Sequence, residues 1–530
     1  MVLFVRSFVP GFGYRLGLGV ALFLGAGGAG GQTAKPVAAI HVYEHENVLG
    51  TSMDLKVRTT SDAEADRAEA AVLTEIDREN KILSAWSADS EFSKWEKTHG
   101  TAEKVSPELF QVLALFDVWR MKTGGALDAS AETAVRAWKL AAAEQRKPTI
   151  DELAAAVATM QRPHWQLDAE QQTAKHLDNA PIALNSFAKS FIAGHAADAA
   201  MAAGATGVLL NIGGDIVVRG AITERVAIAN PRADAENDAP MDLVRIANRT
   251  IATSGSYRRG VEIGGTHFSH IIDPRTGEAV DGVLSSTVVA ADPSEAGALA
   301  TAFSVMTPME SRKLAASLGG VEYLLLLRNG ETVASPGWSR LEVPRVVAAS
   351  YSPSSGGAYA ATIAAKAKSV AAAKPPAVPL DLLVTLELAR IDDPRYRRPY
   401  VSVWIDDADR YPVRTLALWF GKRRWLPELK GWYRDDQART TAEGTDLSTT
   451  ISSATRPPGK YTLRWDGKDN AGKMLKLGKY TINIEVAREH GGYDLLHQEI
   501  SFDGKTAAQF ELSGHQELAG VQMDYGRHAQ

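Results

Sequence analysis

Apolar and polar residues alternate along residues 38–57. Because successive side chains of a strand point to opposite faces, this alternation predicts strands. From Ser61 to Leu83 the period changes, and apolar residues recur at every third or fourth position. Ser61 can cap a helix and Glu64 stands three residues after it, so the spacing predicts one helix over 61–83.

The same two periods mark further elements as far as about residue 343. Helical spacing continues in three stretches, 107–121, 151–160 and 186–203. Strand-like runs follow at 207–212, 216–218, 225–228, 284–289 and 322–327. Helices and strands in mixed order, with glycine-rich turns between them, predict an α+β or α/β fold.

The pattern changes after an Ala/Lys/Pro-rich segment, 347–379, whose composition predicts a linker. Short runs rich in valine, isoleucine, threonine and tryptophan then follow at 382–388, 400–405, 415–420, 461–465 and 480–486. Such runs predict an all-β, Ig-like sandwich over 380–512. Its segment 465–480 is similar to the last hairpin of Ig-like domains, and we treat 513–530 as a tail.

The chain begins with a pattern that is typical of a secretory signal peptide, over residues 1–34. Two arginines precede an apolar run at 16–24, and small residues follow that run. The run is too short to span a bilayer of about 30 Å as a stable anchor. We therefore expect export to the periplasm, cleavage between Ala29 and Ala34, and no stable membrane span afterwards.

The composition excludes several classes of protein. Across 530 residues, Lys+Arg 58 against Asp+Glu 63 gives a net charge of −5, which removes the electrostatic basis for general nucleic-acid binding. The chain has no cysteine, so disulfides, thiolate metal sites, cysteine nucleophiles and a lipoprotein anchor are excluded. With 45% hydrophobic residues, the chain can bury a large core.

Two patterns suggest hydrolases, and we favour neither. Residues 41–45, His-Val-Tyr-Glu-His, match an inverted zinc-peptidase motif that works on a helix, where both histidines share a face. The flanking alternation indicates a strand instead, on which the histidines would lie about 13 Å apart. Ser254, His270 and Asp273 could form a serine-hydrolase triad, but the chain lacks the G-x-S-x-G elbow.

Two turns could carry other chemistry. At Gly213-Gly214-Asp215, glycines let backbone N–H groups form a concave nest for a phosphate, and Asp215 can bond a ribose or flavin donor. An ordinary hairpin turn explains the same residues. The segment 273–277, Asp-Pro-Arg-Thr-Gly, predicts a rigid turn, and His270 before it could act as an acid or base near pH 7 or simply cap a strand.

Taken in chain order, these residues resemble the ApbE family of flavin transferases. The matching segments are Leu49-Gly50-Thr51, Glu75 to Arg78, Leu83 to Ser93, Gly125 to Asp128, Ala188-Lys189, Asn211 to Asp215, Ser254-Gly255 and His270 to Gly277. The resemblance implies an α+β flavin-transferase domain over 38–346. It also implies a metal-dependent enzyme that moves FMN from FAD onto a Thr or Ser hydroxyl of a partner protein and releases AMP.

The resemblance further implies roles for individual residues. His270, Asp273 and Lys189 are expected to be catalytic, with His270 and Asp273 where the acceptor hydroxyl attacks phosphorus. The residues expected to bind FAD are Thr51, Ser84, Trp86, Asp128, Gly213, Gly214, Asp215, Ser254, Gly255 and Thr276. Trp86 stands where the family often has tyrosine, and it is a candidate stacking partner.

The implied magnesium site lacks a ligand in this sequence. The family uses an Asp four residues before a Thr, whereas Thr301 has Gly297 at that offset. Thr301, a main-chain carbonyl near Ser186 and a displaced acid could still hold Mg²⁺. The candidate acids are Glu295 and Asp292. We expect Gly297→Asp to leave transferase activity intact or raise it.

Three functions stay open at this stage: the transferase, a flavin-binding module without transfer activity, and a FAD pyrophosphatase that gives FMN and AMP. Acceptors of this family carry a Ser/Thr-Gly-Ala-Ser/Thr motif, which this chain lacks, so we expect the acceptor to be another redox protein. The sandwich resembles a domain of unknown function found with flavin transferases. Its segments 395–400 and 432–434 form either a docking face or arginines over core aromatics.

Overall fold

A computed structural model describes residues 38–343 and 380–528, apart from gaps at 234, 236, 239, 258, 393–395, 421–422, 446, 448–451, 454 and 490. The expected signal peptide and linker, 1–34 and 347–379, therefore lie outside the described residues. Within the described ranges, no helix combines the length and the apolarity that a membrane crossing requires.

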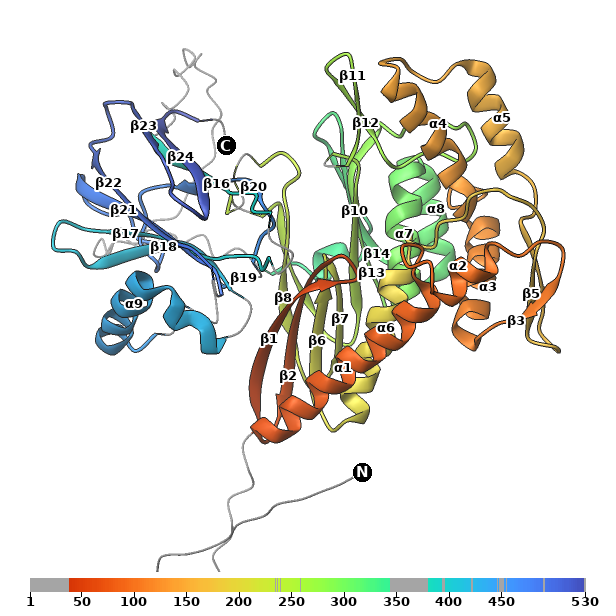
Figure 1. Cartoon of the computed structure of the whole chain (residues 1–530), viewed down its shortest axis with the longest axis horizontal. Helices are drawn as coiled ribbons and strands as arrows, with labels where there is room; N and C mark the ends of the chain where they lie inside the picture. The colour runs from red at the N-terminus through yellow and green to blue at the C-terminus, as the bar shows by residue number, and fades with distance from the viewer. Residues whose placement is uncertain are drawn as a thin grey trace, which may run out of the picture. The chain divides into compact units, whose positions relative to one another are not determined.

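An eight-stranded sheet, antiparallel at every pairing, organises the N-terminal part of the described chain (Figure 1). In spatial order its strands are β1 (Ala39–Val48), β2 (Thr51–Thr59), β6 (Gly207–Ile212), β7 (Asp215–Gly220), β10 (Thr250–Gly255), β13 (Val283–Ala290), β14 (Glu322–Leu327) and β15 (Thr332–Ala334). Antiparallel strands with helices confirm the α+β prediction. Ile212 pairs with Asp215, so the neighbouring strands β6 and β7 are joined by a two-residue turn.

Three helices pack on one face of this sheet: α1 (Asp62–Leu83), α6 (Ala188–Ala202) and α7 (Pro293–Val305) (Figure 1). The helix predicted over 61–83 is confirmed, because Ser61 caps α1 by accepting the N–H of Glu64. The buried apolar residues of α1 keep the predicted spacing: Ala65, Ala68, Val72, Ile76 and Leu83. Helices α6 and α7 are rich in alanine and glycine, which lets them approach each other closely.

The hairpin of β8 (Glu224–Ile228) and β9 (Asp242–Ile246) contributes to a second apolar cluster, on the other face of the sheet. Neighbouring Leu209 and Leu210 in β6 belong to different clusters, as expected when successive side chains point to opposite faces. The sheet is therefore covered on both faces.

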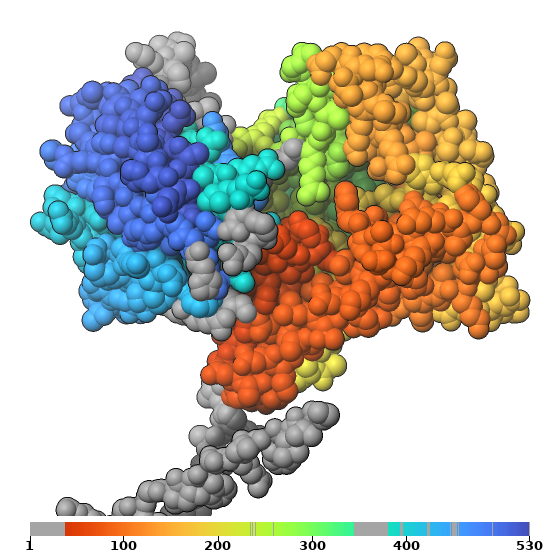
Figure 2. Space-filling view, in the orientation of Figure 1, coloured from red at the N-terminus to blue at the C-terminus, as the bar shows by residue number. Residues whose placement is uncertain are grey.

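The remaining elements of this part lie around the sheet. They are α2 (Glu91–Trp95), β3 (Ala102–Lys104), α3 (Pro107–Lys122), η1 (Ala129–Ala131), α4 (Glu132–Ala143), α5 (Ile150–Met160), β4 (Trp165–Asp168), β5 (Thr173–His176), β11 (Gly260–Ile263), β12 (Thr266–Ser269), α8 (Pro308–Leu318) and η2 (Trp338–Arg340). Figure 2 shows the α4–α5 segment beside the β11–β12 hairpin. There the rings of Trp138 and Phe268 lie 5.1 Å apart.

The C-terminal part consists mostly of strands in two sheets. One sheet has the order β20 (Gly459–Trp465), β16 (Asp381–Leu388), β24 (Leu518–Gly526), β23 (Ala508–Leu512). The other has the order β19 (Ser452–Ser453), β18 (Pro412–Trp419), β17 (Tyr400–Asp406), β21 (Gly478–Ala487), β22 (Tyr493–Phe502). Apolar side chains of both sheets share one core, as a sandwich requires. Helix α9 (Lys430–Glu443) and η3 (Arg423–Glu428) join a separate apolar cluster with β17 and β18.

Two expectations for this part are wrong. Strands β20 and β21 lie in different sheets, so segment 465–480 crosses between sheets rather than forming a hairpin. Strand β24 pairs with β16 along its length and buries Val521, Met523 and Tyr525, so the supposed tail contains a core strand. Of the two alternatives for segment 432–434, Trp432 fits the core aromatic, because it is buried on α9.

Candidate functional site

The turn between β6 and β7 adopts conformations that favour glycine. The φ angles are +57° at Gly213 and +96° at Gly214, and other residues adopt left-handed conformations at a cost of about 1–2 kcal/mol. A Cβ at Gly213 would also lie 2.7 Å from the Thr51 side chain, whereas a Cβ at Gly214 would meet open space. Thr51 therefore lies directly against the turn, and the open side is at Gly214.

Both N–H groups of this turn already have partners. The Gly213 N–H donates to the Ser52 carbonyl at 3.1 Å, and the Gly214 N–H donates to Oδ1 of Asn211 at 3.0 Å. The predicted phosphate nest is therefore not formed by these two N–H groups. What the glycines supply instead is open space beside the backbone at Gly214.

Asp54 fixes the orientation of Asn211. The two residues face each other across β2 and β6, and Nδ2 of Asn211 donates to Oδ2 of Asp54 at 2.8 Å. Because the Gly214 N–H needs an acceptor, Oδ1 of Asn211 must point to the turn and Nδ2 to the carboxylate. Burial raises the pKa of Asp54. The turn is thus held from β2 through an oriented amide.

Two side chains from the start of α6 converge on the turn. Nζ of Lys189 donates to the Gly213 carbonyl at 3.2 Å and lies 3.5 Å from Oδ2 of Asp215. The Ser190 hydroxyl donates to the same carboxylate oxygen at 2.7 Å. Asp215 is buried, while the Lys189 side chain keeps 31% of its surface exposed. The ammonium is therefore held in place and still open to an anionic ligand.

A second group of oxygens lies beside the first. The Thr301 hydroxyl on α7 donates to the Ser186 carbonyl at 3.1 Å and lies 3.3 Å from the Ser254 hydroxyl on β10. The structure thus brings together the predicted metal ligands Thr301 and Ser186 and the predicted FAD residue Ser254. All three oxygens are neutral.

The space beside Gly297 is filled by Ser190. A Cβ at position 297 would lie 2.5 Å from the Ser190 Oγ and 3.1 Å from the Phe187 Cβ. An aspartate there needs Ser190 to move away from Asp215. The expectation that Gly297→Asp leaves activity intact therefore conflicts with the packing of α6 against α7.

Neither displaced acid replaces the missing ligand. Asp292 caps the start of α7 by accepting the Glu295 N–H at 2.8 Å, and nine residues of helix, about 13 Å, separate it from Thr301. Glu295 precedes Thr301 by six residues, which turns its side chain to a different face of the helix. The neutral oxygens at Thr301 do not match the charged oxygen ligands that Mg²⁺ prefers, so these residues do not fit a magnesium ion.

His270 follows β12, and its tautomer is set by a backbone carbonyl. Nδ1 of His270 lies 3.1 Å from the Arg259 carbonyl, which can only accept, so Nδ1 carries the proton and Nε2 keeps a lone pair. Although His270 is an exposed residue, desolvation and the positive charges of Arg259, His267 and Lys139 lower the pKa of its imidazole. The ring is thus a neutral base near pH 7.

Asp273 is engaged by Arg275. The Arg275 Nε donates to Oδ1 of Asp273 at 2.9 Å and its terminal nitrogen donates to Oδ2 at 2.8 Å. The other terminal nitrogen of Arg275 donates to Glu310 at 3.0 Å. The predicted rigid turn exists, since Gly277 has φ +74° and its N–H donates to the Asp273 carbonyl at 2.7 Å. Asp273 therefore shapes the turn and holds the guanidinium.

The other predicted site residues lie as follows. Ser84 ends α1 and accepts the N–H groups of Trp86 and Ser87, and Trp86 itself is 94% exposed. Asp128 caps η1 and pairs with Arg120 at 2.8 Å, so both of its carboxylate oxygens are engaged in contacts within the protein. Gly255 ends β10 close to Tyr257, and the Thr276 hydroxyl accepts the Glu278 N–H.

The hydrolase alternatives are wrong on geometry. Residues 41–45 lie in strand β1, which separates the two histidines of the zinc-peptidase pattern. In the supposed triad, Ser254 contacts Thr301, His270 contacts Arg259 and Asp273 contacts Arg275, so each has another partner.

Sequence reasoning missed two residues of the site. Ser190 directly follows Lys189, bonds Asp215 and occupies the space at Gly297. Arg275 lies in the predicted rigid turn, where its guanidinium pairs with Asp273. Both residues adjoin predicted site residues in the sequence. The role of Ser190 also depends on the packing of α6 on β7 and α7.

A model of the ApbE family matches residues 49–325, which include every element that contributes to this site. The chain belongs to the ApbE family. A second model, described as a predicted periplasmic protein of unknown function (DUF2271), matches residues 381–520. The resemblances inferred for the two parts of the chain are thereby confirmed.

ApbE relatives with curated names are FAD:protein FMN transferases. The Klebsiella pneumoniae protein is 29% identical over 325 residues, which cover 59% of this chain and 92% of that protein. The Escherichia coli K12 protein is 28% identical over 265 residues, 48% of this chain and 75% of that protein. The crystal structure of the ApbE protein from Thermotoga maritima shares the fold, with a TM-score of 0.52 and 24% identity over 58% of this chain and all of that chain.

Proposed function

We propose that this ApbE chain is an exported FAD:protein FMN transferase that moves FMN from FAD onto a Thr or Ser hydroxyl of a redox protein. The observation that carries the proposal is the convergence of Lys189, Ser190 and Asp215 on the open Gly213–Gly214 turn. The names of the curated relatives support it. The description of the C-terminal family supports action in the periplasm.

In this reaction the acceptor oxygen forms a bond to the FMN-side phosphorus while the pyrophosphate P–O bond breaks and AMP leaves. Such a transfer depends on positioning and on stabilising negative charge. Lys189 supplies a fixed cation beside the turn, and Arg275, held by Asp273, supplies another at the His270 loop. We assign Asp273 as a positioning residue.

His270 is proposed as the base that takes the hydroxyl proton. Its Nδ1–H is directed to the Arg259 carbonyl, so the proton is accepted at Nε2. The acceptor is a separate protein with a Ser/Thr-Gly-Ala-Ser/Thr motif. Its hydroxyl would be placed between Nε2 and the phosphorus.

The activity should persist to lower pH than an ordinary histidine base allows. Because the pKa of His270 is lowered from 6.5, more than half of the imidazole is neutral at pH 6.5, and the base is lost as the pH falls further. The pH dependence of kcat/KM for FAD, measured with a saturating concentration of acceptor, tests this expectation. An acid limb centred at or above 6.5, or one that survives His270→Gln, would contradict the assignment.

Trp86 should contribute to FAD affinity and not to stability. Its side chain is 94% exposed, so Trp86→Ala removes little packing, whereas loss of a stacked ring weakens binding by about 1–3 kcal/mol, or about 5- to 150-fold in Kd. Fluorescence titration with FAD measures the affinity, and Trp86→Phe should retain most of it. Equal FAD affinity in Trp86→Ala and the parent protein would exclude stacking.

A second candidate, a flavin-binding module without transfer, is favoured by the neutral oxygens at Thr301 and by Ser190 in the space beside Gly297. Incubation with FAD separates the candidates. With an acceptor domain, the transferase modifies the acceptor and releases AMP, and without acceptor it releases none. A pyrophosphatase releases FMN and AMP in both reactions, and a binding module retains intact FAD in both.

A further inference from the structure

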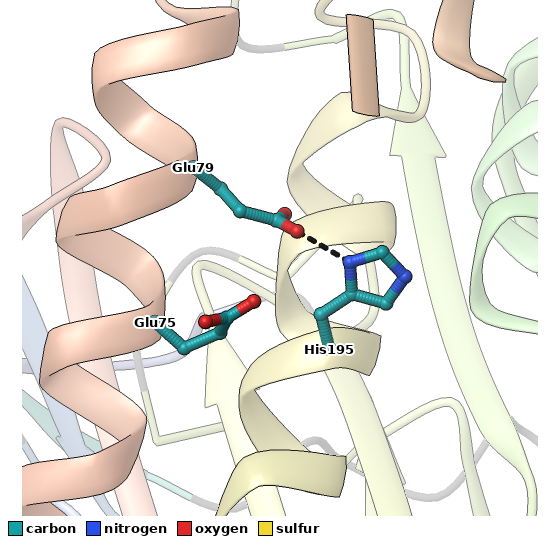
Figure 3. Close-up of side chains that lie close together, drawn as sticks. All are labelled: Glu75, Glu79 and His195. Atoms are coloured by element: carbon teal, nitrogen blue, oxygen red, sulfur yellow. Dashed lines mark hydrogen bonds and ion pairs between the residues drawn. The ribbon is translucent and has the colours of Figure 1, made fainter. Parts of the chain in front are cut away.

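Two carboxylates and an imidazole lie together where α1 packs on α6, outside the site described above. Glu75 and Glu79 stand one turn apart on α1, and His195 faces them from α6 (Figure 3). One ligand atom from each residue lies within 4.8 Å of the other two. Nδ1 of His195 contacts Oε1 of Glu79.

Among the described residues, one buried carboxylate oxygen of Glu79 has no hydrogen-bond partner. The side chain is fully buried, at 0% exposure, and its Oε2 finds no hydrogen-bond partner anywhere in the described part of the chain. Leaving a buried charged oxygen without a partner costs about 1–3 kcal/mol or more. Figure 3 shows the Glu79 carboxylate extending from α1 toward His195. A cation bound by both oxygens of this carboxylate would give Oε2 a partner.

The charges around the cluster also leave room for a cation. The guanidinium of Arg78 lies beside the cluster. It forms ion pairs with Glu75 at 2.7 Å, Glu79 at 3.2 Å and Glu108 at 2.7 Å. Glu79 raises the pKa of the His195 imidazole, so its proton must leave before a metal ion binds. Three carboxylates then face one positive charge. A divalent ion balances the excess of two negative charges, and Arg78 can keep its bond to Glu108.

We propose that Glu75, Glu79 and His195 bind a divalent transition-metal ion of the zinc class that clamps α1 to α6. One imidazole nitrogen with two carboxylates and a water is a donor set that zinc accepts, whereas Mg²⁺ and Ca²⁺ prefer oxygen ligands alone. Two ligand atoms about 2.0 Å from a tetrahedral ion are about 3.3 Å apart, so the contact between His195 Nδ1 and Glu79 Oε1 must open to admit the ion.

The cluster is open to the solvent on one side. The His195 side chain is 38% exposed and Glu75 is partly exposed, while Glu79 forms the buried end. An ion can therefore enter, and a water can complete the coordination. The site is structural, because the FAD-side residues Lys189 and Ser190 lie on the first turn of α6, more than one helical turn before His195.

The test uses the full chain after treatment with a chelator, titrated with Zn²⁺ and followed by calorimetry and thermal unfolding. We expect one ion per chain and a raised Tm, with binding weakened by more than about 100-fold in Glu79→Gln and in His195→Asn. His45→Asn is the matched control, since His45 pairs with Glu69 of α1 at 2.7 Å without a third ligand. It should bind as the parent does.

Three outcomes would overturn the proposal. They are no stoichiometric zinc uptake by the parent chain, uptake unchanged in both ligand variants, and equal binding of Mg²⁺ that does not depend on His195. If Glu79→Gln fails to fold, the partly exposed Glu75→Gln supplies the same comparison. Co²⁺ in place of Zn²⁺ gives a visible absorption spectrum that His195→Asn should change. FAD transfer is assayed separately, so failure of one proposal leaves the other standing.

Discussion

Replacing Lys189 by methionine should lower the rate of FMN transfer by about 10²- to 10³-fold, the usual effect of losing one fixed charge-stabilising group. The ammonium is held 3.2 Å from the Gly213 carbonyl and 3.5 Å from Asp215, so it is in place before the substrate binds. Methionine keeps most of the length of the side chain and removes the charge. Single-turnover transfer from FAD to an acceptor domain measures the rate.

Lys56→Met is the matched control for this experiment. Lys56 lies on β2 of the same sheet, pairs with Glu224 at 3.0 Å and is 34% exposed, close to the 31% of Lys189. It lacks contact with the Gly213–Gly214 turn, so its loss should change the transfer rate less than about twofold and the stability by at most about 1 kcal/mol. A similar rate loss in both variants would show that Lys189 acts through the fold and not on the substrate.

Gly297→Asp should lower the Tm of the mature chain by about 5–10 °C, which corresponds to about 2–3 kcal/mol. The added Cβ would lie 2.5 Å from the Ser190 Oγ and 3.1 Å from the Phe187 Cβ, between two helices that are buried at this point. The carboxylate would be placed there without a partner, and Ser190 would have to leave Asp215. Thermal unfolding at fixed protein concentration measures the change.

The double variant Ser190→Gly/Gly297→Asp should recover part of that loss. Removing the Ser190 hydroxymethyl group opens the space into which an aspartate side chain can enter, so the two changes should couple by about 1–3 kcal/mol. Gly297→Ala separates the steric cost from the charge. Additive effects of the two substitutions would contradict the packing argument. A double variant that transfers FMN faster in Mg²⁺ than the parent would indicate that a carboxylate at 297 restores a metal site.

Local patterns predicted the elements around the site well. The cap at Ser61, the apolar spacing of α1 and the strands on either side of Gly213–Gly214 all depend on residues close in sequence. The prediction of a tail over 513–530 gave too little weight to a local pattern, because Val521, Met523 and Tyr525 alternate as the residues of a strand do. The sequence did not predict helix α9, because its mostly polar residues form no clear apolar stripe. The packing of Trp432 in an apolar cluster stabilises this helix.

The contacts of the site could not be predicted in the same way. Ser190 meets Asp215 because α6 packs on β7, and it fills the space at Gly297 because α6 packs on α7. Asp215 and Gly297 are 25 and 107 positions away from Ser190 in sequence. The Gly-Gly turn was predicted, but its N–H partners, Ser52 and Asn211, depend on the pairing of β2 with β6. The sequence thus predicted most of the residues that belong to the site. It did not predict the strand register or the helix packing that set their contacts.

The most direct test of the transferase assignment is the intact mass of an acceptor domain after incubation with FAD and the purified mature chain. We expect an acceptor heavier by one FMN, with AMP released in equal amount and no product from an acceptor whose target Thr is replaced by Ala. An unmodified acceptor with FAD still bound to this chain would contradict the account and leave a flavin-binding module.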